Sequence, residues 1–490
     1  MSERTTLPAR GSLRLLQATS FVSTVDRFAM PPMLLMMARA LGVPLGSVVH
    51  SASIYFLAYG LMQPVWGIVS DRLGRVRTLR ITLLVAACAT AASAAVGTVG
   101  QLSVARALAG AAFSAAIPAS LIYVGDTVPG ARRQPEITNL MAGVALGTAV
   151  ASLGAGALAQ AVSWRASFLV SAVFALVMVV LLRRLPEPPA GRPAEHLLAP
   201  MVRVARSGAA LLVLAFAFIE GGILLGGLTL LPAAVESSGV SPTVAGAVTA
   251  VYGLAVLVFA RLAGTLSKRW PVWSLIAVGA AAGLIACALA VVSRNAAVGT
   301  AVAVLLGLAW AAMHSSLQTW ATEVLPSARA TVVSGFAGCL FAGSAAASAL
   351  VAGPADAGRY DLAYLGLAVA CVPLGLVSTV YRARWHAPPA ETGPAAQTGP
   401  AAQTGPAAQT GPAPQTDPPA PIGPAAQSGA AAEGGPAAEA SQAMQDSPAA
   451  GDGLDTTPTP AGNGGTRRAA YRKKSATPGR AVDGGHDERA

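Results

Sequence analysis

The stretch that decides the fold runs from Gly67 to Arg77 and reads GIVSDRLGRVR. It is a short cationic segment between two long apolar runs, at 47–69 and 79–98. Charged side chains are tolerated at a membrane edge, where a helix leaves the bilayer. Because the loop is so short, the next helix must enter the bilayer again directly after it. The segment therefore predicts a helical hairpin that crosses a membrane twice, and its arginine excess predicts that this loop is cytoplasmic.

The composition is that of a polytopic membrane protein. Of the 490 residues, 54% are hydrophobic and only 11% are charged, against about 25% charged in a typical soluble domain. The 52 glycines add to a large share of small residues, which let membrane helices pack closely. A net charge of +11 would indicate nucleic acid in a soluble protein, but here the basic residues gather in one set of loops and in the tail. We therefore expect a lipid bilayer as partner, and no nucleic acid.

About twelve apolar stretches reach the length of roughly 20 residues that a membrane span requires. They lie at 14–38, 47–69, 79–98, 101–125, 136–160, 165–183, 209–234, 243–265, 273–293, 297–321, 328–352 and 361–381. Arginine-rich loops alternate with loops that carry few charges, and the rich set lies on the side of both chain ends. The sequence therefore predicts an all-α, multi-pass protein of the cell (inner) membrane with both termini in the cytoplasm.

The chain is expected to divide into a six-helix bundle at 1–183, a cytoplasmic linker at 184–206, a second six-helix bundle at 207–386 and a tail at 387–490. Two echoes indicate that the bundles are repeats. Tyr59-Gly60-Leu61 returns as Tyr252-Gly253-Leu254, an offset of 252 − 59 = 193, and the motif around Pro129 returns around Pro326, an offset of 326 − 129 = 197. The tail repeats TGPAAQ and has almost no large apolar side chain, which predicts disorder. Its basic end is interpreted as solvated, with contact to anionic lipid as the alternative.

The cationic loop resembles the signature motif GxxxDRxGR of the major facilitator superfamily of membrane transporters. The residues that match are Gly67, Asp71, Arg72, Gly74 and Arg75. The fourth span matches a second motif through Arg106, Gly110, Pro118 and Asp126, and the sixth span opens with a matching Trp164-Arg165. The resemblance covers residues 14 to about 382 and is nearest to the twelve-helix drug:proton antiporter branch. It implies twelve transmembrane helices in two pseudo-symmetric six-helix bundles.

The resemblance also implies that the loop acts as a conformational latch formed by Gly67, Asp71, Arg72, Gly74, Arg75 and Asp126. Asp71 would meet the N-terminus of the eleventh helix near Pro326, where free N–H groups favour an anion. Arg75 would lie near Asp126 and hold the cytoplasmic side closed. A topology signal without any latch is the alternative.

Three ionisable residues, Asp26, Arg106 and Glu220, lie deep in apolar spans, where a charge costs about 2.5–3.5 kcal/mol on insertion scales. We expect them to couple transport to protons. The drug:proton resemblance implies that Asp26 is the protonation site and that Arg106 tunes it. A fixed ion pair of Asp26 with Arg27 or Arg106 is the alternative. Glu220 is open to three interpretations: a second proton site, a contact for a cationic substrate, or the partner of an arginine.

Other polar and aromatic residues of the spans are weaker candidates for a substrate cavity. They are Arg27, Tyr59, Gln63, Tyr123, Trp310, His314 and Gln318. A histidine that only packs in the core is an equally good interpretation of His314. The sequence contains no phosphate-binding loop, no paired catalytic carboxylates and no metal-binding cluster. It therefore predicts no enzyme, no catalytic residue, no metal and no cofactor.

These observations predict a secondary active transporter that moves a small-molecule substrate by alternating access, with the proton gradient as its energy source. Proton-coupled efflux of a small amphipathic compound or drug is the first hypothesis for this transport. Export of a sugar or metabolite and proton-coupled uptake are the alternatives. A transport-inactive sensor or scaffold is a separate class, against which the buried charges argue. We expect a monomer.

Overall fold

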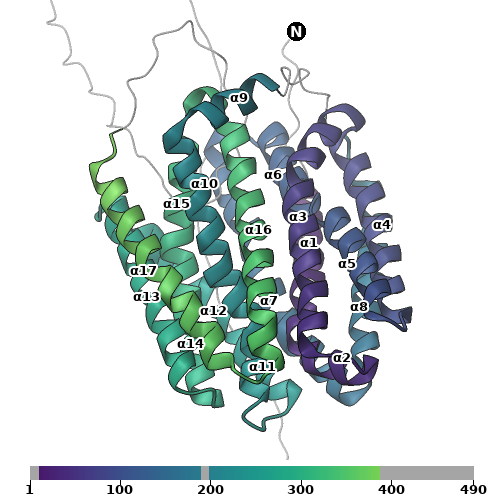
Figure 1. The fold of residues 1–490 in the computed structure, drawn as a ribbon. Helices are drawn as coiled ribbons and strands as arrows, with labels where there is room; N and C mark the ends of the chain where they lie inside the picture. The colour runs from purple at the N-terminus through teal and green to yellow at the C-terminus, as the bar shows by residue number, and fades with distance from the viewer. Residues whose placement is uncertain (1–9, 189–197, 387–490) are drawn as a thin grey trace, which may run out of the picture. The chain divides into compact units, whose positions relative to one another are not determined.

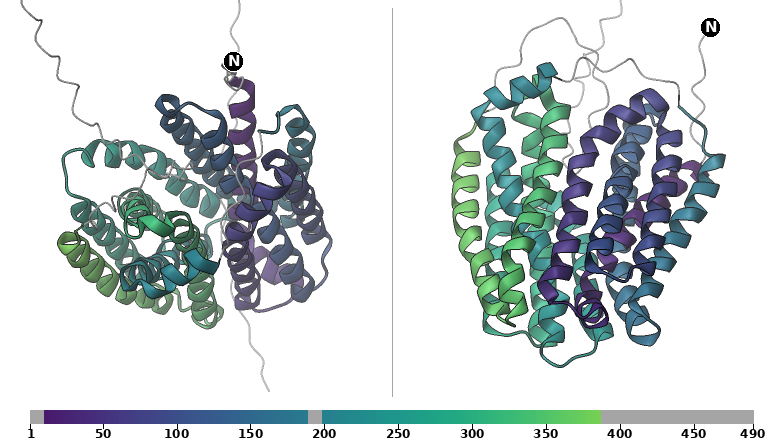
Figure 2. Two further views of the ribbon diagram at one scale, coloured as in Figure 1. Left: turned by 90° about the horizontal axis from the view of Figure 1, so that it is seen from above. Right: turned by 45° about the vertical axis from the view of Figure 1, so that its right-hand side comes forward.

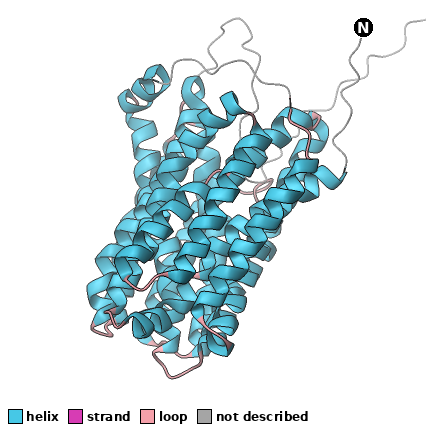
Figure 3. Cartoon of the chain, turned by 90° about the vertical axis from the view of Figure 1, so that its right-hand side faces the viewer, coloured by secondary structure: helices cyan, strands magenta, loops and turns pink. Residues whose placement is uncertain are grey.

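The computed structural model describes residues 10–188 and 198–386. The regular structure in these two ranges is entirely helical (Figures 1 and 3). Eleven of the described helices are long and apolar enough to cross a membrane, so the expected all-α membrane fold is confirmed. Residues 189–197 of the linker and the whole tail from 387, with its repeats and basic end, lie outside the described residues.

The first half of the chain contains the helices α1 (Arg10–Ala29), α2 (Leu34–Leu41), α3 (Leu45–Leu73), α4 (Arg75–Ala95), α5 (Val99–Phe113), α6 (Ala116–Thr127), α7 (Gly130–Ala161) and α8 (Trp164–Leu181). Two single-turn 3-10 helices, Pro31–Met33 and Leu182–Arg184, follow α1 and α8. The helices α5 and α6 together form one membrane span, Val99–Thr127.

The first expected span, 14–38, is not one continuous helix. Helix α1 ends at Ala29, the 3-10 turn Pro31–Met33 follows, and α2 completes the crossing. Two consecutive prolines lack the backbone donors that an α-helix needs, which breaks the helix here. The other eleven expected spans each correspond to one candidate membrane span whose ends lie within a few residues of the predicted ones, and a turn between α5 and α6 interrupts the fourth.

The second half contains α9 (Leu198–Arg206), α10 (Gly208–Gly221), α11 (Gly227–Glu236), α12 (Pro242–Leu266), α13 (Val272–Val292), α14 (Ala296–Ala309), α15 (Ser315–Glu323), α16 (Arg329–Asp356) and α17 (Tyr360–Arg384). A 3-10 turn, Pro326–Ala328, precedes α16. Two π-helical turns, Gly222–Gly226 and Trp310–His314, join α10 to α11 and α14 to α15, so that each pair is one span. Such turns are rare and often mark functional sites.

The two halves, purple to blue and teal to green in Figure 2, meet along two helix pairs, α3 with α16 and α7 with α12. Glycines permit this approach. A Cβ atom on Gly60 of α3 would lie 2.8 Å from the Cβ atom of Phe341, and one on Gly253 of α12 would lie 2.6 Å from the carbonyl oxygen of Ala145. Small residues therefore line these contacts, as is usual where membrane helices pack closely.

The outer faces of the helices are apolar. Val104 on α5, Val180 on α8 and Val369 on α17 are 71%, 53% and 63% exposed, and similar residues occur on most spans. So large an apolar surface would associate in water, whereas a bilayer accommodates it. The protein is therefore a multi-pass membrane protein.

Polar contacts between the two halves occur at the end of the molecule where α2 and α11 are labelled in Figure 1, here called the α2 end. The pairs are Gly46–Asp356, Gln160–Thr243 and Arg39–Glu236. At the opposite end, here called the α9 end, a Cβ atom added to Gly67 would meet nothing within 4 Å. The structure therefore has its halves joined at the α2 end.

Candidate functional site

Asp26 on α1 and Arg106 on α5 form a buried ion pair inside the first half. One carboxylate oxygen of Asp26 accepts a hydrogen bond from Arg106 Nη2 at 2.7 Å, and the other accepts from Nη1 at 3.2 Å. The hydroxyl of Thr90 on α4 donates a third hydrogen bond, at 3.0 Å. The two side chains of the pair are 0% and 1% exposed. An ion pair with Arg106 is one of the arrangements that the sequence left open for Asp26.

Aromatic rings complete the surroundings of Arg106. Its guanidinium carbon lies 4.4 Å from the ring centre of Tyr55 and 4.9 Å from that of Phe168. A cation over an aromatic face gains about 0.5–2 kcal/mol, most where water is excluded. The charge of Arg106 is therefore satisfied on several sides by groups of its own half.

Glu220 and His314 form a second buried acid–base pair, in the other half. Glu220 is the penultimate residue of α10, close to one π-helical turn, and His314 is the last residue of the other. Glu220 is fully buried, and its Oε2 atom lies 3.4 Å from His314 Nδ1. The two carboxylate oxygens of Glu220 and the Nδ1 atom of His314 have no hydrogen-bond partner among the described residues. The imidazole stacks on Trp310 with ring centres 3.9 Å apart.

The two pairs occupy corresponding places in the repeat. Each acid lies on the first span of its half, and each base lies on the fourth. Glu220 follows Asp26 at an offset of 220 − 26 = 194, close to the 193 of the tyrosine echo. Sequence reasoning did not join Glu220 to His314, although this offset was a usable signal for the acid.

Arg27 follows Asp26 directly, but its side chain lies in the contact between the two halves. Its guanidinium carbon is 5.1 Å from the ring centre of Tyr59 on α3 and 5.6 Å from that of Phe341 on α16. The residue is 7% exposed and makes no ion pair or hydrogen bond with another described residue. Tyr252 on α12 lies within electrostatic reach of both Arg27 and Glu220.

The latch residues form a cluster at the α9 end of the first half. Arg75 Nε donates to Asp126 Oδ2 at 3.3 Å, and Arg75 Nη1 donates to Ser70 Oγ at 2.9 Å and to Asp71 Oδ1. Arg75 therefore lies beside Asp126, the neighbour that the resemblance implied. Asp71 does not contact Pro326 through a hydrogen bond or ion pair among the described residues; Arg75 binds it instead. Arg72 is exposed.

A linker residue that sequence reasoning missed completes this cluster. The carboxylate of Glu187 accepts hydrogen bonds at 3.0 Å from the backbone N–H groups of Val76 and Arg77, in the first turn of α4. A helix N-terminus favours a negative charge. Gly74 has a φ of 98°, and a Cβ atom there would lie 2.7 Å from the Glu187 carboxyl. The glycine of the motif is therefore required both by its backbone and by the linker.

The remaining cavity candidates are not gathered at one place. The hydroxyl of Tyr123 donates to the carbonyl of Pro186 at 3.1 Å, so this residue contacts the linker. Gln63 and Gln318 are half-buried, and neither makes a hydrogen bond to Arg27 or Glu220. Tyr59, Trp310 and His314 lie with the buried charges described above.

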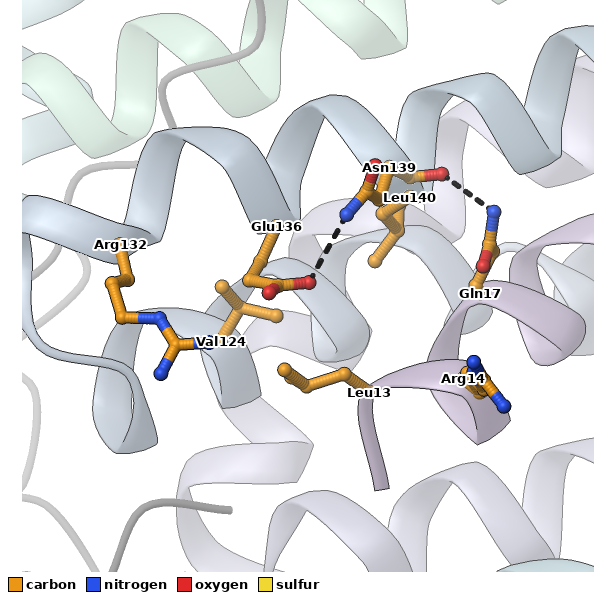
Figure 4. Close-up of a pocket in the computed structure, with 8 residues that line it drawn as sticks. All are labelled: Leu13, Arg14, Gln17, Val124, Arg132, Glu136, Asn139 and Leu140. Carbon is orange, nitrogen blue, oxygen red and sulfur yellow. Dashed lines mark hydrogen bonds between the residues drawn. The ribbon is translucent and has the colours of Figure 1, made fainter. Parts of the chain in front are cut away.

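Two hollows in the described residues are separate from these charges. One, of about 310 Å³, opens at the α9 end between α1, α6 and α7 (Figure 4). Gln17 donates there to the carbonyl of Asn139 at 2.9 Å, and the amide of Asn139 donates to Glu136 at 3.3 Å. The other, of about 480 Å³, lies at the α2 end beside Gly46, His50 and Asp356. No group of three or more metal-ligating side chains occurs in the described ranges.

Comparison with known protein families agrees with the helical membrane fold described above. The family description "Major Facilitator Superfamily" matches residues 18–350, which is more than half of the chain. The chain belongs to this superfamily. It is accordingly a membrane transporter and not an enzyme. No curated protein sequence matches the chain significantly.

Solved structures share the fold of this superfamily member at low sequence identity. A nucleoside transporter superposes with a TM-score of 0.66 at 15% identity, covering 76% of this chain and 99% of the other. A peptide transporter gives 0.64 at 17% identity, with 76% and 94% covered. A D-xylose–proton symporter gives 0.62 at 15% identity, with 76% and 97% covered. Identities this low establish the common fold.

Proposed function

We propose that this superfamily member is a proton-coupled secondary transporter that moves a small amphipathic compound by alternating access, with export as the leading direction. The proton gradient supplies the energy. The resemblance of its motifs to the drug:proton antiporter branch supports export. Arginine-rich loops assign the α9 end to the cytoplasm, so that a molecule joined at the α2 end is closed on the outside. This is the state in which an exporter accepts its substrate.

The environment of Glu220 carries the proposal of proton coupling. Its side chain is fully buried without a hydrogen bond. A buried carboxyl group without a hydrogen bond is unfavourable. Water that enters when the two halves move would supply the missing hydrogen-bond partners. Glu220 beside His314 therefore has the properties of a site that takes up and releases a proton as the two halves move.

Asp26 becomes the second candidate for the proton site. Its carboxylate already accepts three hydrogen bonds, two of them from Arg106. Its hydrogen-bonding capacity is therefore already used within the first half, whereas no described residue hydrogen-bonds the carboxylate of Glu220. We therefore place the coupling proton at Glu220 before Asp26, which reverses the order that the sequence suggested.

Proton movement in proteoliposomes tests the proposal. Vesicles containing the purified full chain and the pH-sensitive dye pyranine are exposed to a panel of small amphipathic compounds. Wild-type protein is expected to give compound-dependent proton flux, and Glu220→Gln is expected to reduce it at least about tenfold. Exchange of labelled compound across the vesicle should persist in Glu220→Gln. Glu136→Gln, a change of the same type at a half-exposed position, is the matched control.

Several outcomes would contradict the proposal. Uphill accumulation by Glu220→Gln at the wild-type level rules out coupling through this residue, and loss in Asp26→Asn alone would move the proton site to the first half. Proton and compound moving in the same direction would establish uptake in place of export. No compound-dependent flux with any compound would favour the sensor or scaffold class.

A further inference from the structure

Arg27 is a buried positive charge that forms no ion pair with any other residue in 10–188 or 198–386. The carboxylate next to it in sequence, Asp26, is fully occupied by Arg106 and Thr90. Glu220, which also lies near Tyr252, has His314 as its near neighbour and forms no ion pair with Arg27. Arg27 therefore differs from Arg106, whose charge is neutralised within its own half.

The groups around Arg27 satisfy it only in part. Its guanidinium faces the rings of Phe28, Tyr59 and Phe341 at 4.9, 5.1 and 5.6 Å. Aromatic faces attract the cation, but no described residue accepts a hydrogen bond from the guanidinium, and its Nε is buried without a partner. The hydroxyl of Tyr59 is likewise buried without a hydrogen bond. Two kinds of donor thus lie together without an acceptor.

The position of Arg27 relates this unsatisfied charge to transport. Tyr59 belongs to α3 and Phe341 to α16, so the guanidinium lies where the two halves meet. Tyr252 of α12, from the second half, lies close enough to interact electrostatically with it. Groups at this contact change their surroundings when the halves move against each other, and substrates of this architecture bind between the repeats near the bilayer midplane.

We propose that Arg27 binds the anionic group of the transported compound, so that the substrates are organic oxyanions with an aromatic or apolar body. A guanidinium binds a carboxylate by donating two parallel hydrogen bonds to it, and the Tyr59 hydroxyl can donate a further one. The rings of Tyr59 and Phe341 supply an apolar surface for the body of the compound. This inference rests on the proposed function only in that a transported compound binds between the halves.

A ligand panel tests this assignment by binding alone. The purified full chain in detergent is screened by thermal shift against matched sets: aromatic carboxylates such as 3-phenylpropanoate, the corresponding amides, amines and phosphonates. Compounds that bind the folded protein raise its melting temperature. Carboxylates or phosphonates are expected to stabilise the wild type more than their amides and amines do. The comparison of these two anions shows whether a planar or a tetrahedral oxyanion is preferred.

Variants assign the effect to Arg27. Arg27→Met is expected to weaken binding of the stabilising anions at least about tenfold, the scale of losing a charged hydrogen bond, and Arg27→Lys should retain part of it. Tyr59→Phe, which keeps the ring, should weaken binding of these anions severalfold. It provides a second test of the site if Arg27→Met does not fold. Arg261→Met, at an exposed arginine of α12 that takes no part in the contacts joining the halves, is the control and should bind like the wild type.

The results separate this inference from the proposed function. A panel without stabilising anions, amines that bind as well as anions, or unchanged anion binding in both Arg27→Met and Tyr59→Phe would overturn the inference. Anions that bind through Arg27 but do not move with protons in vesicles would leave it standing and contradict the proposed function. Proton-driven transport of amines alone would support the proposed function and overturn the assignment of Arg27 as an anion-binding residue.

Discussion

Removing one member of the Asp26–Arg106 pair should destabilise the protein far more than removing both. In Asp26→Asn the guanidinium of Arg106 stays buried without its counterion, and in Arg106→Gln the carboxylate does. The double variant Asp26→Asn/Arg106→Gln buries neither charge. The three variants therefore separate the cost of an unpaired buried charge from the value of the pair.

The geometry sets the expected size of the effect. Both side chains are at most 1% exposed, so water cannot replace the lost partner. Breaking a buried pair on one side costs about 3–5 kcal/mol. The rings of Tyr55 and Phe168 recover part of this for Arg106, so we expect about 3 kcal/mol in Asp26→Asn. The double variant should lie within about 1–2 kcal/mol of the wild type, because it removes the desolvation penalty together with the attraction.

Reversible unfolding in mixed detergent and SDS micelles, followed by circular dichroism, measures these free energies. Asp361→Asn is the control, because the Asp361 side chain is 39% exposed and its pair with Arg359, at 3.3 Å, should contribute little to stability. Equal losses in Asp26→Asn and Asp361→Asn, or a double variant whose loss is the sum of the two single losses, would refute the reasoning.

Two further predictions concern close helix contacts. Gly343→Ala should cost about 1–3 kcal/mol or more in the same unfolding assay, because its Cβ atom would lie 1.7 Å from the carbonyl oxygen of Phe218; Gly154→Ala, with nothing within 4 Å, is its control and should be nearly neutral. Gly46→Leu should hinder closure at the α2 end, because its Cβ atom would lie 2.6 Å from a carboxylate oxygen of Asp356. Labelling of cysteines placed between the halves from that side should rise severalfold, whereas Gly353→Leu, at an open position on the same end of α16, should leave it unchanged.

Local sequence was sufficient for the spans and for the cationic loop. Apolar length predicted the eleven described helices that are long and apolar enough to cross a membrane, because a helix is the form in which a single segment satisfies its own backbone in lipid. Even the break in the first crossing follows from Pro31 and Pro32, since proline lacks a backbone donor. The proximity of Arg75 to Asp71 is likewise local, because residues four apart share one face of a helix or its continuing turn.

The contacts of the buried charges could not be predicted from local sequence. Two adjacent residues of α1 have different surroundings. Asp26 forms an ion pair with Arg106, whereas the side chain of Arg27 lies at the contact between the two halves. Sequence placed both in one apolar span, but the direction of each side chain depends on how α1 is rotated against its neighbours. Glu187 shows the same limit, since its hydrogen bonds reach backbone groups 110 and 111 positions away.

Sequence by itself thus determined that this chain crosses a membrane as helices in two related halves, because burial of apolar segments in lipid is a property of each segment alone. Tertiary structure decided which charges are neutralised and which stay free. Glu220 and His314 are separated by 94 positions, 314 − 220, and come within 3.4 Å only through helix packing. The physical reason is that hydrophobicity acts locally along the chain, whereas the pairing of charges depends on distances between helices.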